Sequence, residues 1–291
     1  MIERQVPMKH RLEIITLNQE ETRIMFDWAR QEGWNPGLQD ASTLYKAAHG
    51  HGALLGIKQD NKLVGVSAVF NHSHLFAYFG LYIVHPDFRE QGLGFEMTRH
   101  RLHLAGQRNI ALDGVIDECP TYRRTGFRMA HKTPRFCFQT LQAHPGGNLT
   151  ALKDITLIEL LDYEQQGLFP CRRKAYLKAW LTQKDAIGYC SMDDNTVQGY
   201  GVMRPCIEGY KIGPLFADTP DIARDILQAL LAETRGASAY CDIPEPNEKG
   251  LQLFESLGGQ KTDFETIRMY NGYEPDLDYS RIFGQTSLEA G

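Results

Sequence analysis

The chain has 291 residues, which is long enough for two domains of ordinary size. Its formal net charge is −5 and it contains no long basic run, so a nucleic-acid partner is not expected. No segment approaches the ~20 apolar residues that span a bilayer, and the first residues lack the apolar core of a secretion signal. These features predict a cytoplasmic protein with no membrane partner.

The six cysteines are scattered along the chain, and no two of them form a C-x-x-C pair. This spacing argues against both a zinc site and a disulfide framework, so we expect reduced thiols and no bound metal. Nothing in the sequence specifies an oligomeric state.

The first half of the chain alternates strand and helix patterns. Apolar residues at helical spacing predict helices at 19–31 and 40–48, and a turn-rich segment, Glu32-Gly33-Trp34-Asn35-Pro36-Gly37, lies between them. Alternating apolar residues predict strands, of which the second and third form a hairpin. The predicted strands are 12–17, 53–58, 62–70, 79–84, 111–116 and 127–138, and two further helices are predicted at 92–105 and 120–125.

The most informative stretch is 85–94, His-Pro-Asp-Phe-Arg-Glu-Gln-Gly-Leu-Gly, which follows a predicted strand and opens a predicted helix. Its two glycines leave the backbone bare, and the first amides of the helix have no acceptor within the helix. Those amides and the positive end of the helix dipole suit a pyrophosphate. The spacing Arg89-x-x-Gly92-x-Gly94 resembles the acyl-CoA-binding signature of the GNAT superfamily of N-acyltransferases.

The order of elements over residues 10–140 is also similar to that of a GNAT domain. The resemblance implies an α/β (α+β) fold with a mixed central sheet flanked by helices, and acetyl-CoA as co-substrate. It implies that main-chain groups of Ile83 and Val84 pair with the pantetheine arm, and that one of their amides stabilises the oxyanion on the thioester carbonyl. The pyrophosphate is then expected to meet the charge of Arg89 and the amides of Gln91, Gly92, Leu93, Gly94 and Phe95.

The second half repeats the same plan with different residues. The predicted strands are 155–159, 186–192, 197–205, 210–216, 237–243 and 262–270, and the predicted helices are 162–167, 172–180, 221–233 and 247–257. The segment aligned with the glycine loop, 217–222, has neither glycine nor arginine, and Asp218 and Asp221 would repel a pyrophosphate.

The whole chain therefore resembles a tandem GNAT family in which each domain has its own mixed sheet. The implied organisation is a catalytic domain at 1–141, a linker at 142–150 and a GNAT-like domain at 151–291 that is degenerate in its CoA-binding loop. The role of the tail, 273–291, is left open by the sequence.

Tyr122 is the candidate general acid for the departing thiolate. The run Tyr122-Arg123-Arg124-Thr125-Gly126-Phe127 resembles the Tyr-x-x-x-Gly-Phe element of the family, and a phenol with a reference pKa of about 10 is protonated at neutral pH. The alternative is a tyrosine that only packs on a short helix. The aligned residue of the second half is Phe254, which cannot donate a proton.

Several residues are candidates for the general base. Asp117 and Glu118 follow a predicted strand and could accept the ammonium proton directly or through water, and Tyr78 and His85 are alternatives. Cys119 would form a covalent acyl-enzyme only with a histidine and an acid beside it, and the sequence shows no obvious pair.

Trp34 and Asn35 lie where GNAT domains place the acceptor-side loop, although Trp34 could equally pack in the core. The resemblance implies transfer of an acetyl group from acetyl-CoA to a primary amine of a small molecule or peptide, by direct attack in a ternary complex. Two alternatives stay open. One is a non-catalytic sensor of acyl-CoA, and the other is a second half that recognises the acceptor in a cleft between the domains.

Overall fold

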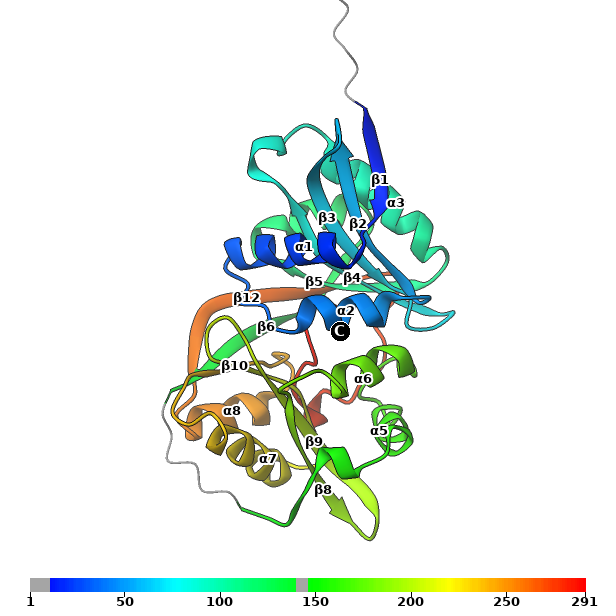
Figure 1. Ribbon diagram of the computed structural model, residues 1–291. Helices are drawn as coiled ribbons and strands as arrows, with labels where there is room; N and C mark the ends of the chain where they lie inside the picture. The colour runs from blue at the N-terminus through cyan, green and yellow to red at the C-terminus, as the bar shows by residue number, and fades with distance from the viewer. Residues whose placement is uncertain (1–10, 140–145) are drawn as a thin grey trace, which may run out of the picture.

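The computed structural model describes residues 11–139 and 146–291. These residues form a mixed α/β structure in which a continuous 13-stranded sheet runs through both halves of the chain, with helices packed on it (Figure 1). The strand order is β1-β2-β3-β4-β5-β12-β6-β11-β10-β9-β8-β7, and β13 pairs with β10 outside this path.

The N-terminal half has the order of elements that the sequence predicts, and the bounds agree to within a few residues. Its elements are β1 (Leu12–Thr16), α1 (Gln19–Gln31), α2 (Asp40–Ala48), β2 (Gly52–Gln59), β3 (Lys62–Phe70), β4 (Phe76–Val84), α3 (Leu93–Ala105), β5 (Asn109–Val115), α4 (Cys119–Arg124) and β6 (Arg128–Phe138). Helices α1 and α2 cover one face of the sheet and α3 covers the other. Asn18 begins α1 because its side-chain oxygen accepts the N–H groups of Glu20 and Glu21, both at 2.9 Å.

The C-terminal half follows the same plan, but its first predicted strand is wrong and its first helix, predicted at 162–167, instead begins at Leu157 and ends at Glu164. Its elements are β7 (Leu149–Ala151), α5 (Leu157–Glu164), α6 (Lys174–Leu181), β8 (Ile187–Asp193), β9 (Thr196–Pro205), β10 (Tyr210–Ala217), α7 (Pro220–Ala232), β11 (Ala239–Asp242), α8 (Glu248–Ser256), β12 (Gln260–Asn271) and β13 (Ile282–Gly284). The strand predicted at 155–159 is wrong, because Thr156 and Glu159 form a capping box that begins α5. Strand β7 begins at the end of the predicted linker and extends one residue past it, and residues 142–145 of that linker lie outside the described residues.

The two halves exchange strands at the centre of the sheet. Strand β12, from the C-terminal half, lies between β5 and β6 and pairs antiparallel with both. Strand β6, from the N-terminal half, in turn pairs with β11. Thr266 of β12, for example, stands opposite Val115 on one side and Thr133 on the other. Each half keeps its mixed sheet and flanking helices as predicted, and the exchange joins the two sheets into one.

Buried ion pairs also link the halves. Asp40, at the start of α2, accepts hydrogen bonds from Arg204 Nε at 2.9 Å and Nη2 at 3.1 Å, and from the N–H of Gly37 at 2.7 Å. Burial alone would raise the pKa of Asp40, but Arg204 and Gly37 more than offset that effect, and the pKa lies below its ordinary value. Arg268 of β12 binds Asp113 of β5 in the same way, at 2.9 and 2.8 Å.

The tail packs into the junction between the halves. Figure 1 shows the end of the chain between α2 and α6. His72 of the N-terminal half donates to the carbonyl oxygen of Ala290 at 2.7 Å, and Arg173 of the C-terminal half donates to the main-chain oxygen of Gly291. The segment whose role the sequence leaves open is therefore held by both halves.

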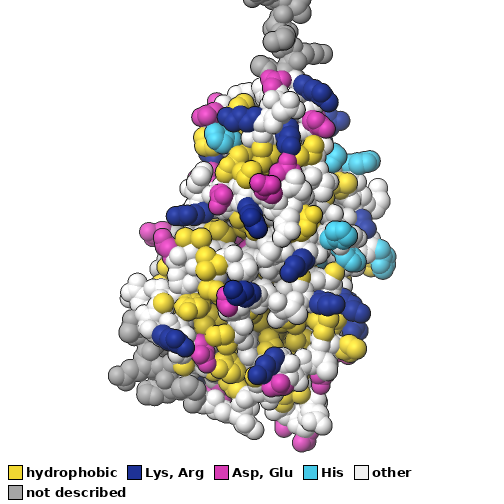
Figure 2. Space-filling model, in the orientation of Figure 1, with side chains coloured by type: hydrophobic (Ala, Val, Ile, Leu, Met, Phe, Trp, Pro, Cys, Tyr) yellow, Lys and Arg dark blue, Asp and Glu magenta, His cyan; other side chains and the backbone are white. Residues whose placement is uncertain are grey.

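On the face of the molecule shown in Figure 2, basic and acidic side chains are interspersed rather than gathered in one basic patch. Within residues 11–139 and 146–291, no helix combines the length and the apolar character that crossing a membrane requires.

The burial of the His131 imidazole leads us to expect a loss of stability at mildly acidic pH. Its imidazole, on β6, packs against Tyr279 with ring centroids 4.8 Å apart, and neither ring nitrogen has a hydrogen-bond partner among the described residues. Burial, with a smaller effect of Arg268, lowers the pKa of His131 to about 3, whereas an unfolded histidine titrates near ~6.5. The unfolded state therefore takes up the proton first. The contribution of His131 to stability is complete above the pKa of the unfolded state. It falls as the pH drops from that pKa toward the pKa of the folded state.

We expect His131 alone to reduce the free energy of unfolding by about 2 kcal/mol between pH ~6.5 and ~5. Urea denaturation at the two pH values measures the loss. His131→Phe keeps a ring against Tyr279 and should remove that part of the pH dependence. An equal loss in the variant would show that other groups are responsible.

Candidate active site

An extra residue in β4 opens the sheet between β4 and β5. Leu81 and Tyr82 of β4 stand opposite the single residue Ser67 of β3, and Leu81 has a φ of +50°. This bulge turns the strand, and β4 pairs with the parallel strand β5 only as far as Phe79. Beyond Phe79 the two strands diverge, which leaves main-chain groups of both facing a wedge-shaped gap.

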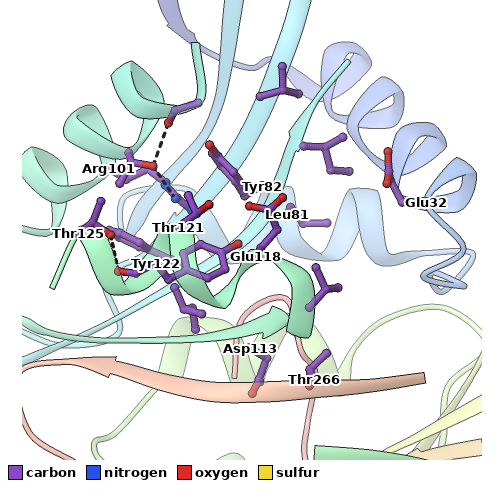
Figure 3. Close-up of a pocket in the computed structure, with 18 of the residues that line it drawn as sticks. Glu32, Leu81, Tyr82, Arg101, Asp113, Glu118, Thr121, Tyr122, Thr125 and Thr266 are labelled. Carbon is purple, nitrogen blue, oxygen red and sulfur yellow. Dashed lines mark hydrogen bonds between the residues drawn. The ribbon is translucent and has the colours of Figure 1, made fainter. Parts of the chain in front are cut away.

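A cavity of about 670 Å³ occupies this gap (Figure 3). Its volume is in the range of small-molecule binding sites. The N-terminal half supplies β4, β5, the start of α3 and α4, whereas the C-terminal half supplies Phe264 and Thr266 of β12 and Leu288 and Glu289 of the tail. Both halves of the chain are therefore needed to complete the site.

The predicted glycine loop lies at the start of α3, on the wall of this cavity. Gly92 is the N-cap and has a φ of +81°, a conformation that favours glycine. A Cβ on Gly94 would lie 2.0 Å from the hydroxyl of Tyr82, so a larger residue would displace that side chain. The N–H groups of Leu93 and Gly94 stand at the first two positions of the helix, where no intrahelical acceptor exists. These amides are donors suited to an anion.

Two other predicted cofactor residues are engaged within the protein. The N–H of Phe95 donates to the carbonyl oxygen of Gly92 at 3.1 Å, and the Phe95 side chain is 61% exposed at the cavity rim. The side chain of Gln91 turns back and donates to the carbonyl oxygen of Asp87 at 3.2 Å, and Gln91 is not part of the cavity wall. The structure thus favours Leu93 and Gly94 over these neighbours as anion donors.

Ile83 and Val84 both line the cavity, but their amides face opposite ways. The N–H of His85 donates to the carbonyl oxygen of Val64 on β3 at 2.9 Å. Because inward and outward main-chain groups alternate along an antiparallel pair, the amide of Ile83 faces β3 and that of Val84 faces the gap. Val84 is therefore the better placed of the two to bond a ligand.

Arg89 lies at the rim of the cavity, where its guanidinium is already paired with a carboxylate. Its Nε donates to the carbonyl oxygen of Val84 at 3.0 Å, and its guanidinium forms an ion pair with Glu32 of the loop after α1. A phosphate at the rim would have to share Arg89 with Glu32.

Tyr122 stands on α4 with its ring inside the cavity wall, as Figure 3 shows. The ring packs on the bare backbone of Gly114, where a Cβ would approach it to 2.6 Å, and its centroid lies 6.4 Å from that of Tyr82. Burial raises the pKa of Tyr122 well above that of a free phenol, and the nearby charge of Arg101 partly opposes this rise. Tyr122 is therefore a protonated phenol beside a cation.

Arg101 is a cavity residue that the sequence reasoning missed. It is 1% exposed, and no carboxylate among the described residues pairs with it. One Nη donates to Thr98 at 3.2 Å, while its Nε has no partner within that part of the chain. The guanidinium lies over the rings of Phe79 and Tyr82, 4.7 and 4.5 Å from their centroids, and Figure 3 shows it on the α3 side of the cavity. An unpaired buried cation is costly for the fold, which points to a functional role.

A sequence signal for Arg101 did exist. Leu93, Met97, Arg101 and Ala105 follow each other at intervals of four residues, and all four are buried. Arg101 therefore interrupts the apolar stripe of α3, and a charge at such a position is unusual in a helix that packs on a sheet.

The carboxylates predicted as bases lie apart. Glu118 lines the cavity from an exposed turn, whereas Asp117 is exposed and outside the cavity wall. Tyr78 is buried and hydrogen-bonded to Asp113, and burial raises its pKa well above the ordinary value. Asp113 is in turn bound by Arg268. Tyr78 and Asp113 therefore form a closed network rather than a free base.

The structure also shows the surroundings of His85, the other alternative base, and of Cys119, the possible nucleophile. His85 packs against Trp28 with ring centroids 5.4 Å apart and accepts the N–H of Asp87 at 3.4 Å, outside the cavity wall. Cys119 is buried, and burial raises the pKa of its thiol. A thiol that stays protonated is a poor nucleophile, which disfavours a covalent acyl-enzyme.

The two predicted acceptor residues have different surroundings. Trp34 lines the cavity, and its carbonyl oxygen accepts a hydrogen bond from Lys211 of the C-terminal half at 2.9 Å. Asn35 exchanges two hydrogen bonds of 2.9 Å with the main chain of Glu208 and lies outside the cavity wall. Asn35 thus links the two halves by hydrogen bonds, while Trp34 is part of the cavity wall.

In the C-terminal half, the equivalent gap is filled by the chain itself. Strand β10 pairs with the parallel strand β11 only as far as Ile212. Beyond that point β13 pairs antiparallel with β10, with Leu215 opposite Gly284, and the N–H of Gln285 donates to the carbonyl oxygen of Asp242 on β11 at 2.8 Å. The tail therefore occupies the space that corresponds to the cavity of the first half.

The loop after β10 also differs from the glycine loop as the sequence indicates. Thr219 caps α7 by accepting the N–H of Ile222 at 3.3 Å. Asp218 is bound by Arg281 and by the hydroxyl of Tyr163 at 2.9 Å. An acidic side chain thus stands where the first half offers bare amides.

Comparison with protein families agrees with this repeated architecture. A model described as "Acetyltransferase (GNAT) family" matches residues 15–127, and one described as "Acetyltransferase (GNAT) domain" matches residues 161–284. Together they cover most of both halves. The chain belongs to the GNAT acetyltransferase family, and within that family it is a tandem protein with two GNAT domains.

Relatives of similar length support the class of enzyme. The chain is 28% identical over 276 residues to a protein named holothin acyltransferase from Pseudoalteromonas sp. (strain SANK 73390), covering 94% of this chain and 92% of that one. It is 22% identical over 269 residues to "Uncharacterized N-acetyltransferase YitH" of Bacillus subtilis (strain 168), covering 90% and 93%. The family and these relatives identify an acyltransferase.

Solved structures share the fold over the whole chain. A putative acetyltransferase from Pyrococcus horikoshii has a TM-score of 0.80 at 21% identity, covering 100% of this chain and 99% of that one. A tandem GNAT protein from the clavulanic acid biosynthesis pathway has a TM-score of 0.62 at 14% identity, covering 91% and 100%. The tandem arrangement therefore occurs in other proteins of this fold.

Proposed function

We propose that the protein transfers an acetyl group from acetyl-CoA to a primary amine of a small molecule or peptide, by direct attack in a ternary complex. The observation that carries this proposal is the cavity between β4 and β5, because one wall combines the bare amides at the start of α3 with the phenol of Tyr122. The names of the relatives, an acyltransferase and an N-acetyltransferase, agree with it.

The cavity residues fit an acyl-CoA. The amides of Leu93 and Gly94, at the positive end of the α3 dipole, would hold the pyrophosphate. The N–H of Val84, which faces the gap, would donate to a carbonyl oxygen of the pantetheine arm as a neighbouring strand does. Arg89 would add positive charge at the rim.

Tyr122 is the proposed general acid. As the amine attacks, the C–N bond forms and the C–S bond breaks, and the phenol gives its proton to the departing thiolate. Burial keeps Tyr122 protonated beforehand. Arg101, which lowers the pKa of Tyr122, would stabilise both the thiolate and the phenolate that remains. This gives the unpaired cation a role in the reaction.

The second GNAT domain is proposed not to bind CoA. Strand β13 fills the space beside β10, and Asp218 stands at the loop where a pyrophosphate would lie. One acyl-CoA per chain is therefore expected.

Tyr122→Phe is expected to lower kcat by at least about 10²-fold, since a positioned acid or base contributes roughly that much, while the Kd for acetyl-CoA stays within about twofold. Release of free thiol from acetyl-CoA with a panel of primary amines measures the first, and calorimetry measures the second. Tyr45→Phe, a tyrosine on α2 outside the cavity wall, is the matched control.

Unchanged turnover in Tyr122→Phe would remove Tyr122 from the mechanism. If the wild-type protein binds acetyl-CoA but transfers acetyl to no amine, the sensor alternative replaces the proposed function.

A further inference from the structure

We infer that Glu289 binds the ammonium group of the acceptor and takes its proton, so that the tail of the chain builds the acceptor end of the cavity. This inference rests on the proposed function, because it assigns the proton acceptor for amine acetylation. It replaces the bases predicted after β5 with a residue of the second half.

The tail crosses β4 at the bulge. A Cβ on Gly80 would lie 1.9 Å from the carbonyl oxygen of Glu289, so the two backbones are in direct contact. Gly80 directly precedes Leu81, where β4 separates from β5. Leu288 and Glu289 line the cavity at this point.

The tail and Tyr122 lie on opposite sides of the sheet. Leu81 and Ala290 pack in the core cluster that contains α1 and α2 residues, and Trp34 of the predicted acceptor loop packs against it. Tyr122 belongs to the cluster under α3. Direct attack needs a proton acceptor near the attacking nitrogen and an acid near the departing sulfur, and Glu289 and Tyr122 would supply these two functions from different sides of the sheet.

The carboxylate of Glu289 is unengaged. The residue is 7% exposed, yet no hydrogen bond or ion pair from the described part of the chain uses its side chain. The other acidic residues on the cavity wall differ from Glu289. Glu32 and Asp113 form ion pairs with arginines, and Glu90 and Glu118 are exposed. Glu289 is thus the buried carboxylate of this wall that remains available to a cation.

Bonds on both sides of Glu289 fix its position. Before it, Thr286 accepts from Arg173 at 2.7 Å and Ser287 accepts from the hydroxyl of Tyr176 at 3.1 Å. After it, Ala290 accepts from His72 at 2.7 Å. Strand β13 continues the anchoring into the space of the second domain. The filled pocket of that domain therefore serves to hold the carboxylate in place, as a precise site requires.

The surroundings of Glu289 are mostly cationic. Lys211 is buried, and its ammonium bonds the carbonyl oxygen of Trp34. Burial and Arg135 lower the pKa of Lys211, while Glu289 opposes that change. Arg135 itself is bound to Asp242. The charged and titratable groups within electrostatic reach of Glu289 are Arg135, Lys211, Arg204, Tyr176 and Cys206.

The proton balance of the step is complete with these residues. The acceptor enters as R–NH₃⁺ and gives one proton to Glu289, and the free amine attacks the thioester carbonyl carbon. The C–S bond breaks as Tyr122 protonates the thiolate. The second N–H proton leaves as the amide forms and restores Tyr122 through water, and Glu289 returns its proton to solvent. The sum is one amide, one free thiol and one released proton.

Glu289→Gln is the first test, made on the full chain with an amine that the wild type acetylates. We expect kcat/KM for the amine at pH ~7 to fall about 10²-fold, with the Kd for acetyl-CoA unchanged. The deficit should shrink as the pH approaches the pKa of the amine, because the amine then arrives already deprotonated. A merely structural role would give a deficit that does not vary with pH.

Glu289→Ala supplies a second, independent readout. Added formate should restore part of its activity at neutral pH by replacing the missing carboxylate, and should leave Glu289→Gln unchanged. Asp276→Asn removes an exposed carboxylate of the same tail and should behave as the wild type.

Wild-type kcat/KM and pH dependence in Glu289→Gln would overturn this inference and leave the proposed function intact. A deficit that is equal at every pH, without rescue by formate, would also overturn it. Absence of transfer by the wild-type protein would instead overturn the proposed function, and the inference with it.

Discussion

A chain cut after residue 141 is expected to yield no folded, CoA-binding domain. Such a fragment contains β1 to β6 and the glycine loop, but it lacks β12, which lies between β5 and β6. Both strands would then expose unpaired main-chain groups, and the buried Arg268 would be missing from Asp113. Circular dichroism and calorimetry with acetyl-CoA should show loss of cooperative unfolding and of binding.

Co-expression of residues 1–141 with residues 142–291 is the matched control for that cut. The pair contains every strand of the shared sheet, so we expect it to recover acetyl-CoA binding. Cooperative unfolding and full affinity in the 1–141 fragment alone would show that the strand exchange is dispensable for the first domain.

Arg204→Met is expected to lower the free energy of unfolding by about 3–5 kcal/mol, because it leaves the buried carboxylate of Asp40 without its partner. Asp40 and Arg204 are both almost fully buried and belong to different halves, so the loss should appear as weaker association of the two halves as well as a lower denaturation midpoint. Denaturant unfolding followed by fluorescence measures the change.

Three further variants give that measurement its controls: Asp40→Asn, the double variant and Arg172→Met. Arg204→Met combined with Asp40→Asn removes the unpaired charge, and the double variant should be less destabilised than the sum of the two single variants. Arg172→Met breaks an exposed pair with Asp162 and should cost at most about 1 kcal/mol. Equal losses of the free energy of unfolding in Arg204→Met and Arg172→Met would mean that the buried pair stabilises the fold no more than the exposed pair does.

Secondary-structure elements with a local cause were predicted to within a few residues. Helix α3 begins directly after Gly92, and the short helix that carries Tyr122 lies a few residues after β5. The strand predicted at 155–159 is wrong for an equally local reason, because the Thr156–Glu159 capping box begins a helix within that apolar stretch.

Features that depend on distant residues were not predictable from the pattern. The bulge at Leu81 depends on how β4 is aligned with β3, which the residues of β4 alone do not specify. The insertion of β12 between β5 and β6 depends on which strands pair across the two halves of the chain. Glu289 reaches the cavity only because the tail runs through the second domain. Its sequence surroundings, a short polar stretch near the end of the chain, contain no motif that indicates a site.

The shared sheet also bears on the order of events at the ribosome. Val115 of β5 pairs with Thr266, which is synthesised much later, so the first domain cannot close its sheet when its own residues have emerged. Until β12 arrives, the growing chain exposes two strand edges that could pair with another chain. We therefore expect nascent chains of this protein to depend on chaperones for longer than those of single-domain relatives.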